Sequence, residues 1–506
     1  MSASRHSPVG VLTPAEARER DSAAEREWNT PPAVLMEAAG RAAAAVVHAL
    51  YPSGRVVAAV GTGSNGGDAL VLLRTLGAWG REVAALPLAD SPLPGELARG
   101  WELPVAEDSE RALLSAGVVV DGLLGTGARG APREPASSII LEINRSGRPV
   151  VALDGPSGVD LLTGQTPGAA VRADVTVTFD VLKRGLLRFP GRALAGRIVV
   201  AEIGLGPLTE PSALLLDRGW ARAALPPVAP DAHKGTLGTV AVVAGREGMA
   251  GAAILAGTAA GRAGAGLVRL VSVAENRTIL QTALPEAVFI ERGEKGLGAA
   301  LEDADAVLVG PGIGVDRAAA ALLERVLARG DAPVLVDADA ITLLAAAPEL
   351  ARGKERPLLL TPHPGELGRV LECSASEVTD DPFAAAREAA SWFACAVLLK
   401  GSPSLVAAPG QPVAVNLTGH SGLATGGSGD TLAGVAAAFL ALGCDPWSAA
   451  GLALFVSGRA AELAGRGRSL LARDVSASLP AALAWLGEPG DPPVAAGVIA
   501  DLPPPS

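Results

Sequence analysis

The sequence predicts an α/β protein made of two three-layer αβα domains joined by a linker. Three observations lead to this expectation. The 506 residues are too many for one ordinary domain. Short β-branched runs alternate with longer helical patterns along most of the chain, as expected of parallel sheets covered by helices. Aromatic residues make up only 3% of the chain and there are 62 glycines, so we expect closely packed cores of Ala, Val and Leu.

Composition and charge restrict the partners that we expect. Hydrophobic residues make up 49% and charged residues 19%, which is typical of a globular chain. A formal net charge of −11 argues against nucleic acid or an anionic membrane as the main partner. No apolar run approaches the length of a membrane span, and the first dozen residues lack a signal-peptide core. The three cysteines show no metal or disulfide spacing, so a cytoplasmic location is expected.

The first half opens with two predicted helices and a βαβ unit. The capping box Thr13-Pro14-Ala15-Glu16 predicts a charged helix to about residue 28, and a second helix is expected over residues 35–50. A predicted strand over residues 55–60 ends in the glycine-rich turn of residues 61–68, G-T-G-S-N-G-G-D. A helix to residue 79 and a strand over residues 82–88 follow. A turn of this composition suits a phosphate or a ribose.

Two further predicted strands of the first half end in a carboxylate. Residues 118–120 lead to Asp121, and residues 150–153 lead to Asp154, with Ser157 three positions later. Because ligands bind beyond the carboxyl ends of parallel strands, these side chains and Asn65 are expected to converge on one crevice. Oxygen donors of this kind suit an alkali or alkaline-earth cation better than zinc. The alternative is that each residue only caps its own turn.

Five motifs place the first half in a known family. They are G-T-G-S-N-G-G-D from Gly61, D-G-L-L-G-T-G-A-R-G from Asp121, L-D-G-P-S-G-V-D from Leu153, A-D-V-T-V-T-F from Ala173 and K-R-G-L-L from Lys183. Together they resemble the YjeF N-terminal domain, which has a Rossmann-like fold, and predict such a domain over residues 1–205. The resemblance implies an epimerase that acts on NAD(P)H hydrates at the hydroxyl-bearing ring carbon and binds potassium.

Site residues of the first half follow from this resemblance. Potassium would be held by Asn65, Asp121 and Ser157. The substrate would be lined by Ser64, Asn65, Gly66, Gly67, Asp68, Gly125, Thr126, Gly127, Ala128, Arg129, Gly130, Ala131 and Asp154. Asp154 would also transfer the proton, and Lys183 is a weaker candidate for that step.

The second half again alternates strands and helices. Residues 206–232 are rich in proline and predict a linker with one short helix around Trp220. A second domain is predicted over residues 233–486, and residues 487–506, rich in Pro and Gly, predict a disordered tail. The strands of this domain are expected over residues 239–244, 267–273, 306–309, 334–336, 358–360 and 396–399, with helices such as 251–263 and 317–328 between them.

The stretch A-T-G-G-S-G-D-T-L-A-G, residues 424–434, is the strongest single signal in the chain. Its glycines let backbone N–H groups face an anion, and the helix that follows adds its positive end, so the stretch favours a phosphate. Asp430 lies at the start of that helix. A carboxylate beside a phosphate cradle can take a proton from a hydroxyl during phosphoryl transfer. The alternative is a glycine-rich turn with an aspartate cap.

Six motifs in order resemble the ADP-dependent NAD(P)H-hydrate dehydratases, a ribokinase-like family. They are A-H-K-G from Ala232, G-P-G-I-G from Gly310, D-A-D-A from Asp337, T-P-H-P-G-E from Thr361, L-K-G from Leu399 and the glycine-rich stretch. The resemblance implies phosphoryl transfer from ADP to the ring hydroxyl, with Asp430 as the base and magnesium at the phosphates, followed by loss of phosphate. Substrate contacts would come from Ala252, Gly314, His363 and Asp430, and nucleotide contacts from Lys400, Gly401, Ser402, Pro403, Ser404 and Gly429. The segment T-G-H-S-G at residues 418–422 departs from the usual T-G-N-P-G, and we assign no role to His420 or Ser421.

The two resemblances occur in the order of a bifunctional NAD(P)H-hydrate repair enzyme, an isomerase joined to a lyase. Such an enzyme epimerises the R and S hydrates and dehydrates the S form to NAD(P)H at the expense of ADP. We expect small-molecule substrates, potassium, magnesium and a homo-oligomer, and neither nucleic acid nor a membrane as partner. Two alternatives stay open: a ribokinase-superfamily kinase for a sugar or vitamin, and a non-enzymatic binding role for the first half. The sequence does not decide between ADP and ATP or between NADH and NADPH hydrate.

Overall fold

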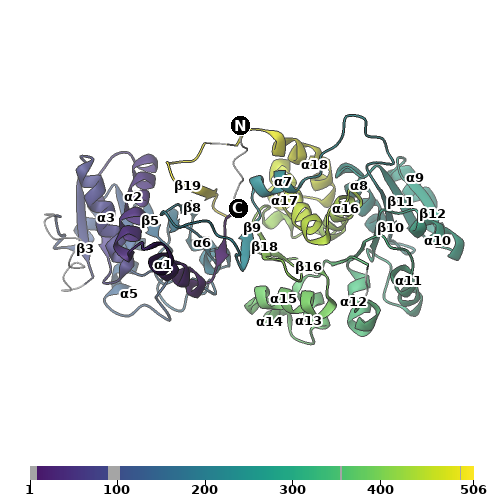
Figure 1. Ribbon diagram of the computed structural model, residues 1–506, viewed down its shortest axis with the longest axis horizontal. Coiled ribbons are helices and arrows are strands. Elements are labelled where there is room, and N and C mark those ends of the chain that lie inside the picture. The colour runs from purple at the N-terminus through teal and green to yellow at the C-terminus, as the bar shows by residue number, and fades with distance from the viewer. Residues whose placement is uncertain (1–7, 89–102, 354–355, 491, 506) are drawn as a thin grey trace. The chain divides into compact units, whose positions relative to one another are not determined.

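The computed structural model describes residues 8–88, 103–353, 356–490 and 492–505, and it divides them into two compact units (Figure 1). The first unit consists of Val9–Ser212 together with Gly490–Pro505. The second consists mainly of Ala213–Pro489. Each unit has its own sheet and its own apolar cores.

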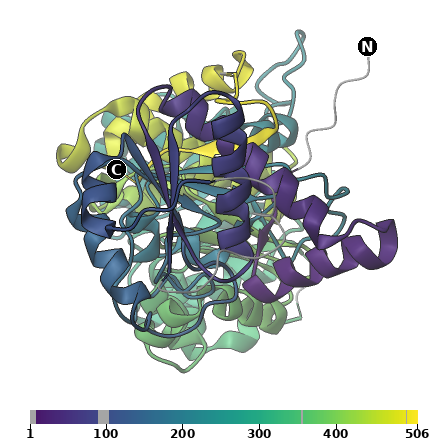
Figure 2. The ribbon, with the colours of Figure 1, turned by 90° about the vertical axis from the view of Figure 1, so that its left-hand side faces the viewer.

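The first unit is a seven-stranded sheet between layers of helices (Figure 2). The strand order is β19-β8-β6-β5-β4-β2-β3, and every pairing except β19–β8 is parallel. Its elements are β1 (Val11–Leu12), α1 (Pro14–Trp28), α2 (Pro32–Leu50), β2 (Val56–Val60), α3 (Ser64–Ala78), β3 (Val83–Pro87), α4 (Ser109–Ser115), β4 (Val118–Gly122), α5 (Ala136–Arg145), β5 (Val150–Leu153), β6 (Val175–Phe179), β7 (Leu182–Lys183), α6 (Gly191–Leu194), β8 (Arg197–Ala201) and β19 (Val498–Leu502).

Alternating residues of the strands build two cores, one on each face of this sheet. On β2, Val56, Ala58 and Val60 face a core shared with α2 and α3. Val57 and Ala59 face a second core shared with α4 and α5. The alternation follows from the two-residue period of a strand, and burial of both faces explains why β2 is apolar throughout. The expected three-layer arrangement is therefore present.

The chain changes direction across the sheet between β2 and β4. From β2 it passes to β3 on one side, and it then returns to β4 on the other side of β2. The crevice beyond the carboxyl ends of the strands at such a switch point is where open α/β sheets bind ligands. The turn after β2 is tight: a Cβ on Gly66 would lie 1.9 Å from the Gly61 carbonyl oxygen, so only glycine fits there.

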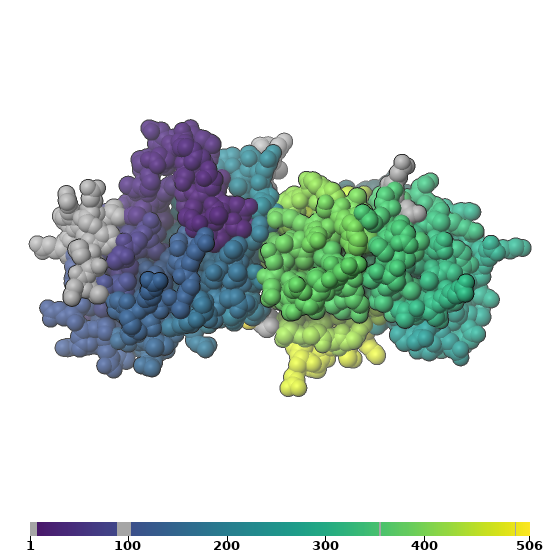
Figure 3. All heavy atoms as spheres, turned by 90° about the horizontal axis from the view of Figure 1, so that it is seen from below, coloured from purple at the N-terminus to yellow at the C-terminus, as the bar shows by residue number. Residues whose placement is uncertain are grey.

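The second unit is a ten-stranded sheet covered by helices. Its strand order is β12-β11-β10-β13-β14-β15-β16-β17-β18-β9, with antiparallel pairings only at β16–β17 and β17–β18. The strands are β9 (Ala213–Leu215), β10 (Thr239–Val243), β11 (Leu267–Ser272), β12 (Val288–Glu291), β13 (Ala306–Val309), β14 (Val334–Val336), β15 (Leu358–Leu360), β16 (Ala396–Leu399), β17 (Ser404–Ala407) and β18 (Val413–Asn416). The helices are α7 (Arg218–Ala224), α8 (Ala250–Arg262), α9 (Arg277–Ala283), α10 (Glu294–Glu302), α11 (Arg317–Ala328), α12 (Asp339–Ala346), α13 (Pro364–Val370), α14 (Ala375–Asp380), α15 (Pro382–Phe393), α16 (Ser428–Ala441), α17 (Pro446–Ala464) and α18 (Ala472–Gly487). Figure 3 shows α13–α15 on the face turned toward the viewer.

Part of the predicted linker is folded in the structure. Within residues 206–232, β9 pairs with β18 and α7 follows it, capped by Asp217. Trp220 of this helix packs edge-to-face on Trp447 of α17, with ring centroids 5.7 Å apart. The expected short helix is present, but the second unit begins at Ala213 and not at residue 233.

The tail predicted to be disordered, residues 487–506, contains a strand. β19 pairs antiparallel with β8, so the tail belongs to the first unit although it follows the second in sequence. Arg197 of β8 forms an ion pair with Asp501, and the buried Arg192 donates a hydrogen bond to the carbonyl of Pro503. The Pro- and Gly-rich composition concealed a five-residue strand whose pairing depends on residues far away in sequence.

Among the described residues, α2 alone has the length and apolar composition of a membrane-crossing helix. Its buried residues, among them Leu35, Ala43 and Val47, contribute to the core against β2. Core helices of globular proteins share this composition.

Candidate active sites

The residues expected to hold potassium lie together beyond the carboxyl ends of β2, β4 and β5. Ser157 donates to Asp121 twice, from Oγ to Oδ1 at 2.7 Å and from its backbone N–H to Oδ2 at 2.8 Å. The backbone of Leu124 connects Ser157 to Asn65. Its N–H donates to Ser157 Oγ at 2.9 Å, and its carbonyl accepts from Asn65 Nδ2 at 3.0 Å. Three turns distant in sequence thus meet at one point, as the sequence predicted.

Two features of Asn65 and Asp121 are consistent with a bound cation at this point. Asn65 is buried, and its Oδ1 has no hydrogen-bond partner among the described residues. Asp121 is fully buried, and burial raises the pKa of its carboxyl, although hydrogen bonds from Ser157 and Leu123 oppose the rise. A buried acceptor without a donor costs free energy, on the order of 1–3 kcal/mol, unless something else contacts it.

Asp154 forms a buried ion pair with Lys183. Asp154 follows β5 and has a φ of +63°, in the left-handed region of the backbone. Lys183 Nζ lies 2.5 Å from Asp154 Oδ1 and also donates to Thr178 Oγ1 at 3.0 Å and to the Phe179 carbonyl at 3.1 Å. An ammonium has three N–H donors, so this lysine is fully hydrogen-bonded.

Two further carboxyls lie near this pair. Burial, reinforced by the carboxylates of Asp154 and Asp21, holds the pKa of Asp68 well above its ordinary value. Burial also raises the pKa of Asp21 to about 6, against the attraction of Lys183. Asp68 was among the expected substrate residues, whereas Asp21 was missed because α1 has the sequence of a charged, solvated helix.

The remaining expected residues of the first site fall into two segments. Ser64, Asn65, Gly66, Gly67 and Asp68 form the first turns of α3, so the expected turn is already helical. Residues 125–131 form an exposed loop after β4. The two segments are in close contact, since a Cβ on Gly125 would lie 3.1 Å from the Asn65 Cβ. Arg18 of α1 also contacts the second segment, donating to the Thr126 carbonyl at 2.9 Å.

In the second unit, Asp430 lies in the first turn of α16, directly after the glycine-rich turn. Gly427, with a φ of +83°, is the N-cap of this helix, and the N–H groups of a first helical turn have no acceptor within the helix. Burial, then repulsion from Asp337, raises the pKa of Asp430 to about 7, against the attraction of Lys400. The expected base therefore lies at the expected anion cradle.

Lys400 lies among carboxylates. Its Nζ is 2.9 Å from Asp337 Oδ1 and 3.9 Å from Glu366 Oε2, and a Cβ on Gly429 would lie 3.6 Å from it. Burial lowers the pKa of Lys400, but these carboxylates and Asp430 raise it more. Asp337 is buried at the end of β14 and also accepts from Thr361 Oγ1 at 2.7 Å. Its Oδ2 has no hydrogen-bond partner in the part of the chain that the structure describes. The sequence found each residue but not this network.

His363 lies beside the same network. It caps α13: its Nδ1 accepts from the Gly365 N–H at 3.0 Å, and Glu366 accepts from the His363 N–H at 2.8 Å. The imidazole remains exposed, with its Nε2 3.4 Å from Glu366 Oε1. The imidazole is therefore accessible, and its contact with the substrate stays a prediction.

The expected residues Ala252 and Gly314 lie on α8 and on the loop after β13. Ala252 of α8 lies against the loop after β13, since a Cβ on Gly312 would lie 3.2 Å from the Ala252 Cβ. Gly314 donates its N–H to Asp339 Oδ2 at 2.8 Å, and the side chain of Arg246 passes over it. Arg246 was missed, because nothing in its local pattern distinguishes it from a surface arginine.

Residues 400–403 form the turn between β16 and β17, and Ser404 is the first residue of β17. Ser404 Oγ accepts from the Gly401 N–H at 3.2 Å and donates to the Gly401 carbonyl at 2.9 Å. Gly401 and Ser402 are exposed, whereas Pro403 is buried. The turn thus carries Lys400 toward Asp337 and presents its other polar groups to solvent.

Comparison with known proteins agrees with this geometry. The family described as YjeF-related protein N-terminus matches residues 32–185, and the family described as NAD(P)H-hydrate dehydratase matches residues 240–481. A bifunctional NAD(P)H-hydrate repair enzyme of Moorella thermoacetica is 35% identical over 96% of this chain and 99% of its own. That of Escherichia coli is 38% identical over 88% of each chain. The chain belongs to the bifunctional NAD(P)H-hydrate repair enzymes.

Solved structures support the fold of the second unit. A ribokinase-like superfamily protein of Enterococcus faecalis is 26% identical, with a TM-score of 0.51, and the match covers 56% of this chain and 99% of that one. The expected family, the α/β fold class and an epimerase joined to a dehydratase are confirmed. The roles of single residues stay predictions.

Within this repair-enzyme family, the chain's variant segment at residues 418–422 has a structural explanation. His420 Nδ1 accepts from the Gly422 N–H at 3.0 Å, and its Nε2 lies 3.1 Å from the Ala461 carbonyl oxygen of α17. Thr418 Oγ1 also contacts α17, at the carbonyls of Leu454 and Phe455. The imidazole therefore anchors the segment that precedes the glycine-rich turn.

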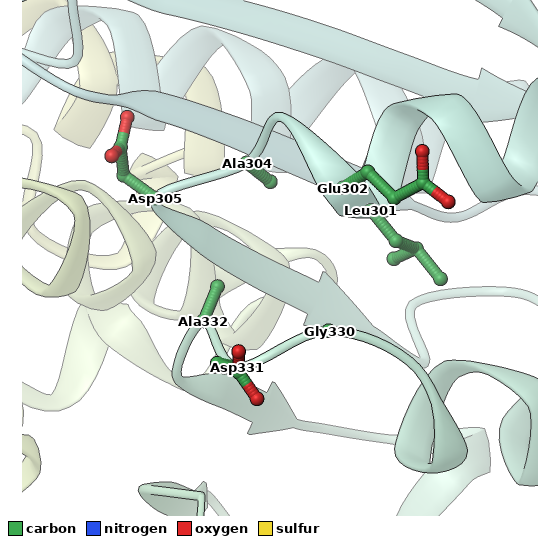
Figure 4. Close-up of a pocket in the computed structure, with 7 residues that line it drawn as sticks. All are labelled: Leu301, Glu302, Ala304, Asp305, Gly330, Asp331 and Ala332. Carbon is green, nitrogen blue, oxygen red and sulfur yellow. The ribbon is translucent and has the colours of Figure 1, made fainter.

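The hollow in Figure 4 is not part of either site. It is open and lined by residues of the segments 301–305 and 330–332 of the second unit. Asp305 directly precedes β13, and Ala332 lies just before β14, so the hollow is at the amino ends of the strands. Asp337 follows the carboxyl end of β14, whereas the hollow lies at the amino ends of the strands.

Proposed function

We propose that Asp430 is the base of the dehydratase and acts on the ring hydroxyl of the S hydrate. The observation that carries this proposal is its position in the first turn of α16, beside Lys400 and after the glycine-rich turn. A carboxylate there can accept the hydroxyl proton while the oxygen attacks the terminal phosphoryl group of ADP. AMP leaves with the electrons of the broken phosphorus–oxygen bond. The phosphate ester formed then loses phosphate, a far better leaving group than hydroxide, together with a proton from the neighbouring ring carbon, and the dihydronicotinamide is restored.

The surrounding residues have separate tasks in this reaction. N–H groups of residues 426–429 stabilise the negative charge of the transferred phosphoryl group. Lys400 compensates the charge of Asp337 and Glu366 and stabilises the ionised form of Asp430. Ala252, Gly314 and His363 line the hydrate, and residues 401–404 contact the nucleotide.

Magnesium fits the second site. An ion bound mainly by phosphates needs only one or two protein carboxylates, and within the described ranges Asp337 Oδ2 is buried without a hydrogen-bond partner. When bound, the ion neutralises charge that develops on the phosphate oxygens. Asp337 is the residue that would hold it.

For the first unit we assign proton transfer to Asp154 and a monovalent cation to Asn65, Asp121 and Ser157. These three supply oxygen donors with one formal negative charge, and Asn65 Oδ1, which no described residue contacts by a hydrogen bond, can contact a cation. A bound potassium ion would neutralise Asp121. The Leu124 peptide, hydrogen-bonded to Asn65 and Ser157, would then hold the loop of residues 125–131 against the substrate.

The test incubates the purified full chain with mixed R and S hydrates and either ADP or ATP. We expect both epimers to be consumed, with return of reduced-nicotinamide absorbance and release of inorganic phosphate, and the comparison of the two nucleotides identifies the preferred donor. The Asp430→Asn variant is the matched control and should still interconvert the two hydrates but lose most of the dehydration. A stable phosphorylated product without restored absorbance would instead indicate a small-molecule kinase. Localisation in the cytoplasm and a homo-oligomeric state also stay predictions.

A further inference from the structure

The N-terminal segment of the first unit, residues 9–28, packs over the Asp154–Lys183 pair. β1 pairs in parallel with β7, and Leu12 is the partner of Lys183 in this register. Leu12 and Ala17 are buried together with Val181. α1 therefore starts beside Lys183, although the matched YjeF-related region begins only at residue 32.

One face of α1 is directed at the epimerase site. Residues three, four and seven positions apart share a helix face, which places Ala17, Arg18 and Asp21 together. Ala17 contacts the core of this segment, and Arg18 donates to the Thr126 carbonyl in the substrate loop. The neighbouring Arg20 holds the helix by an ion pair of 2.5 Å with Asp180. Asp21 thus shares a helix face with Arg18, which contacts the substrate loop, and with Ala17, which packs beside Val181.

Asp21 lies in a charged environment that the mechanism has not yet used. Its side chain is exposed as a whole, but its carboxyl is surrounded closely enough that burial raises its pKa to about 6. One charged group near Asp21, Arg20, lies on the same helix. The others come from four separate elements or turns: Lys183, Asp154, Asp180 and Asp68. A group with a pKa close to the working pH can both give and accept a proton.

The chemistry of the substrate requires two proton-transfer groups. A dihydronicotinamide contains an enamine, and water adds to it with the hydroxyl on the carbon next to the ring nitrogen. That carbon changes configuration if its bond to nitrogen opens and closes again on the other face. Opening needs a base for the hydroxyl proton and an acid for the nitrogen.

We propose that Asp21 is the second proton-transfer group of the epimerase, an inference that rests on the epimerase function proposed above for Asp154. Asp154 takes the hydroxyl proton, the carbon–oxygen double bond forms, and the carbon–nitrogen bond breaks with its electrons on nitrogen. Nitrogen then accepts the proton of Asp21. Rotation about the carbon–carbon bond beside the new aldehyde presents the other face, and the same transfers in reverse close the ring with no net change in protons.

The test measures interconversion of separated R and S hydrates by the full chain without nucleotide, so that dehydration does not occur. Asp21→Asn should slow interconversion roughly a hundredfold or more, the usual range for loss of an acid–base group. Because Asp21 acts as the acid in its protonated form, kcat/KM of the wild type should fall tenfold per pH unit above about pH 6. This fall in kcat/KM above pH 6, the alkaline limb of the profile, should be absent in Asp21→Asn and retained in Asp21→Glu.

Glu19→Gln is the matched control, since Glu19 lies on the opposite side of α1 and pairs with Arg26. It should leave both rate and pH profile unchanged. Dehydration of the S hydrate with ADP by the same Asp21→Asn preparation reports whether the second unit is intact, and the thermal unfolding profile reports on the first. A folded Asp21→Asn protein with the wild-type rate, or a slow one that keeps the limb above pH 6, overturns the inference. A wild-type chain that interconverts neither epimer overturns the epimerase function itself.

Discussion

The two units each bury a lysine against an aspartate at the carboxyl edge of a sheet, but one pair is closed and the other is open. Lys183 is 4% exposed and uses its donors on Asp154, Thr178 and Phe179. Lys400 is 22% exposed, and its partner Asp337 keeps a buried oxygen that accepts no hydrogen bond from any residue the structure describes. The difference matches the two reactions. Proton exchange needs fixed charges, whereas phosphoryl transfer needs a site that can receive additional charge from phosphates and a metal ion.

The largest effect is expected when the base of the open site is removed. Asp430→Asn should lower dehydration roughly a hundredfold or more, because no other carboxylate lies in the first turn of α16. Interconversion of R and S hydrates by the same variant should be unchanged, and nucleotide binding should persist. The measurement is a single-turnover assay with S hydrate, together with nucleotide titration by calorimetry. Near-normal turnover in the folded variant would remove Asp430 from the mechanism.

Removing each lysine tests the contrast between the two pairs directly. Lys183→Met leaves Asp154 buried without a cation, and we expect a loss of roughly 3–5 kcal/mol in the free energy of unfolding of the first unit. Lys400→Met should cost less, about 1–3 kcal/mol, because Lys400 is closer to solvent and Asp337 keeps its bond from Thr361. Denaturant titrations of both full-length variants measure this. Equal losses would mean that the difference in exposure has no energetic meaning.

The two sites should also respond to pH in opposite directions. The proposed base, Asp430, would work in its ionised form, and burial raises its pKa to about 7, so kcat/KM for dehydration should fall tenfold per pH unit below pH 7. Interconversion should instead fall above about pH 6. Parallel profiles of both activities on one preparation test the prediction. The same slope in both would argue that one shared group limits the two reactions.

The smallest expected effect concerns the cation of the first site. At equal ionic strength, interconversion should be several-fold faster in potassium than in sodium or in a bulky organic cation, while dehydration of the S hydrate serves as the internal reference. Asp121→Ala should be slow in all three salts, because it removes the only formal charge among Asn65, Asp121 and Ser157. Equal wild-type rates in every salt would leave Asp121 as a turn-capping residue.

The sequence predicted local features well. The capping box gave α1 its start, and strands 306–309, 334–336, 358–360 and 396–399 have the predicted bounds, because each is a short apolar run between polar turns. It also predicted that Asn65, Asp121 and Ser157 would meet, since parallel strands bring their carboxyl ends to one edge. Asp21 and the Lys400–Asp337 pair could not be assigned in this way. Their environment depends on contacts between distant segments, such as β1 with β7.

β19 affects the order in which this chain folds as it is synthesised. β8 and its neighbour β19 are separated in sequence by the whole of the second unit, so a ribosome makes the epimerase sheet with one edge uncovered. At about 5–20 residues per second that interval is on the order of tens of seconds. Meanwhile Arg192 and Arg197 face water in place of the tail. Because completion of the first sheet waits for the dehydratase to be made, a truncated product that ends early leaves an unpaired strand for quality control to detect.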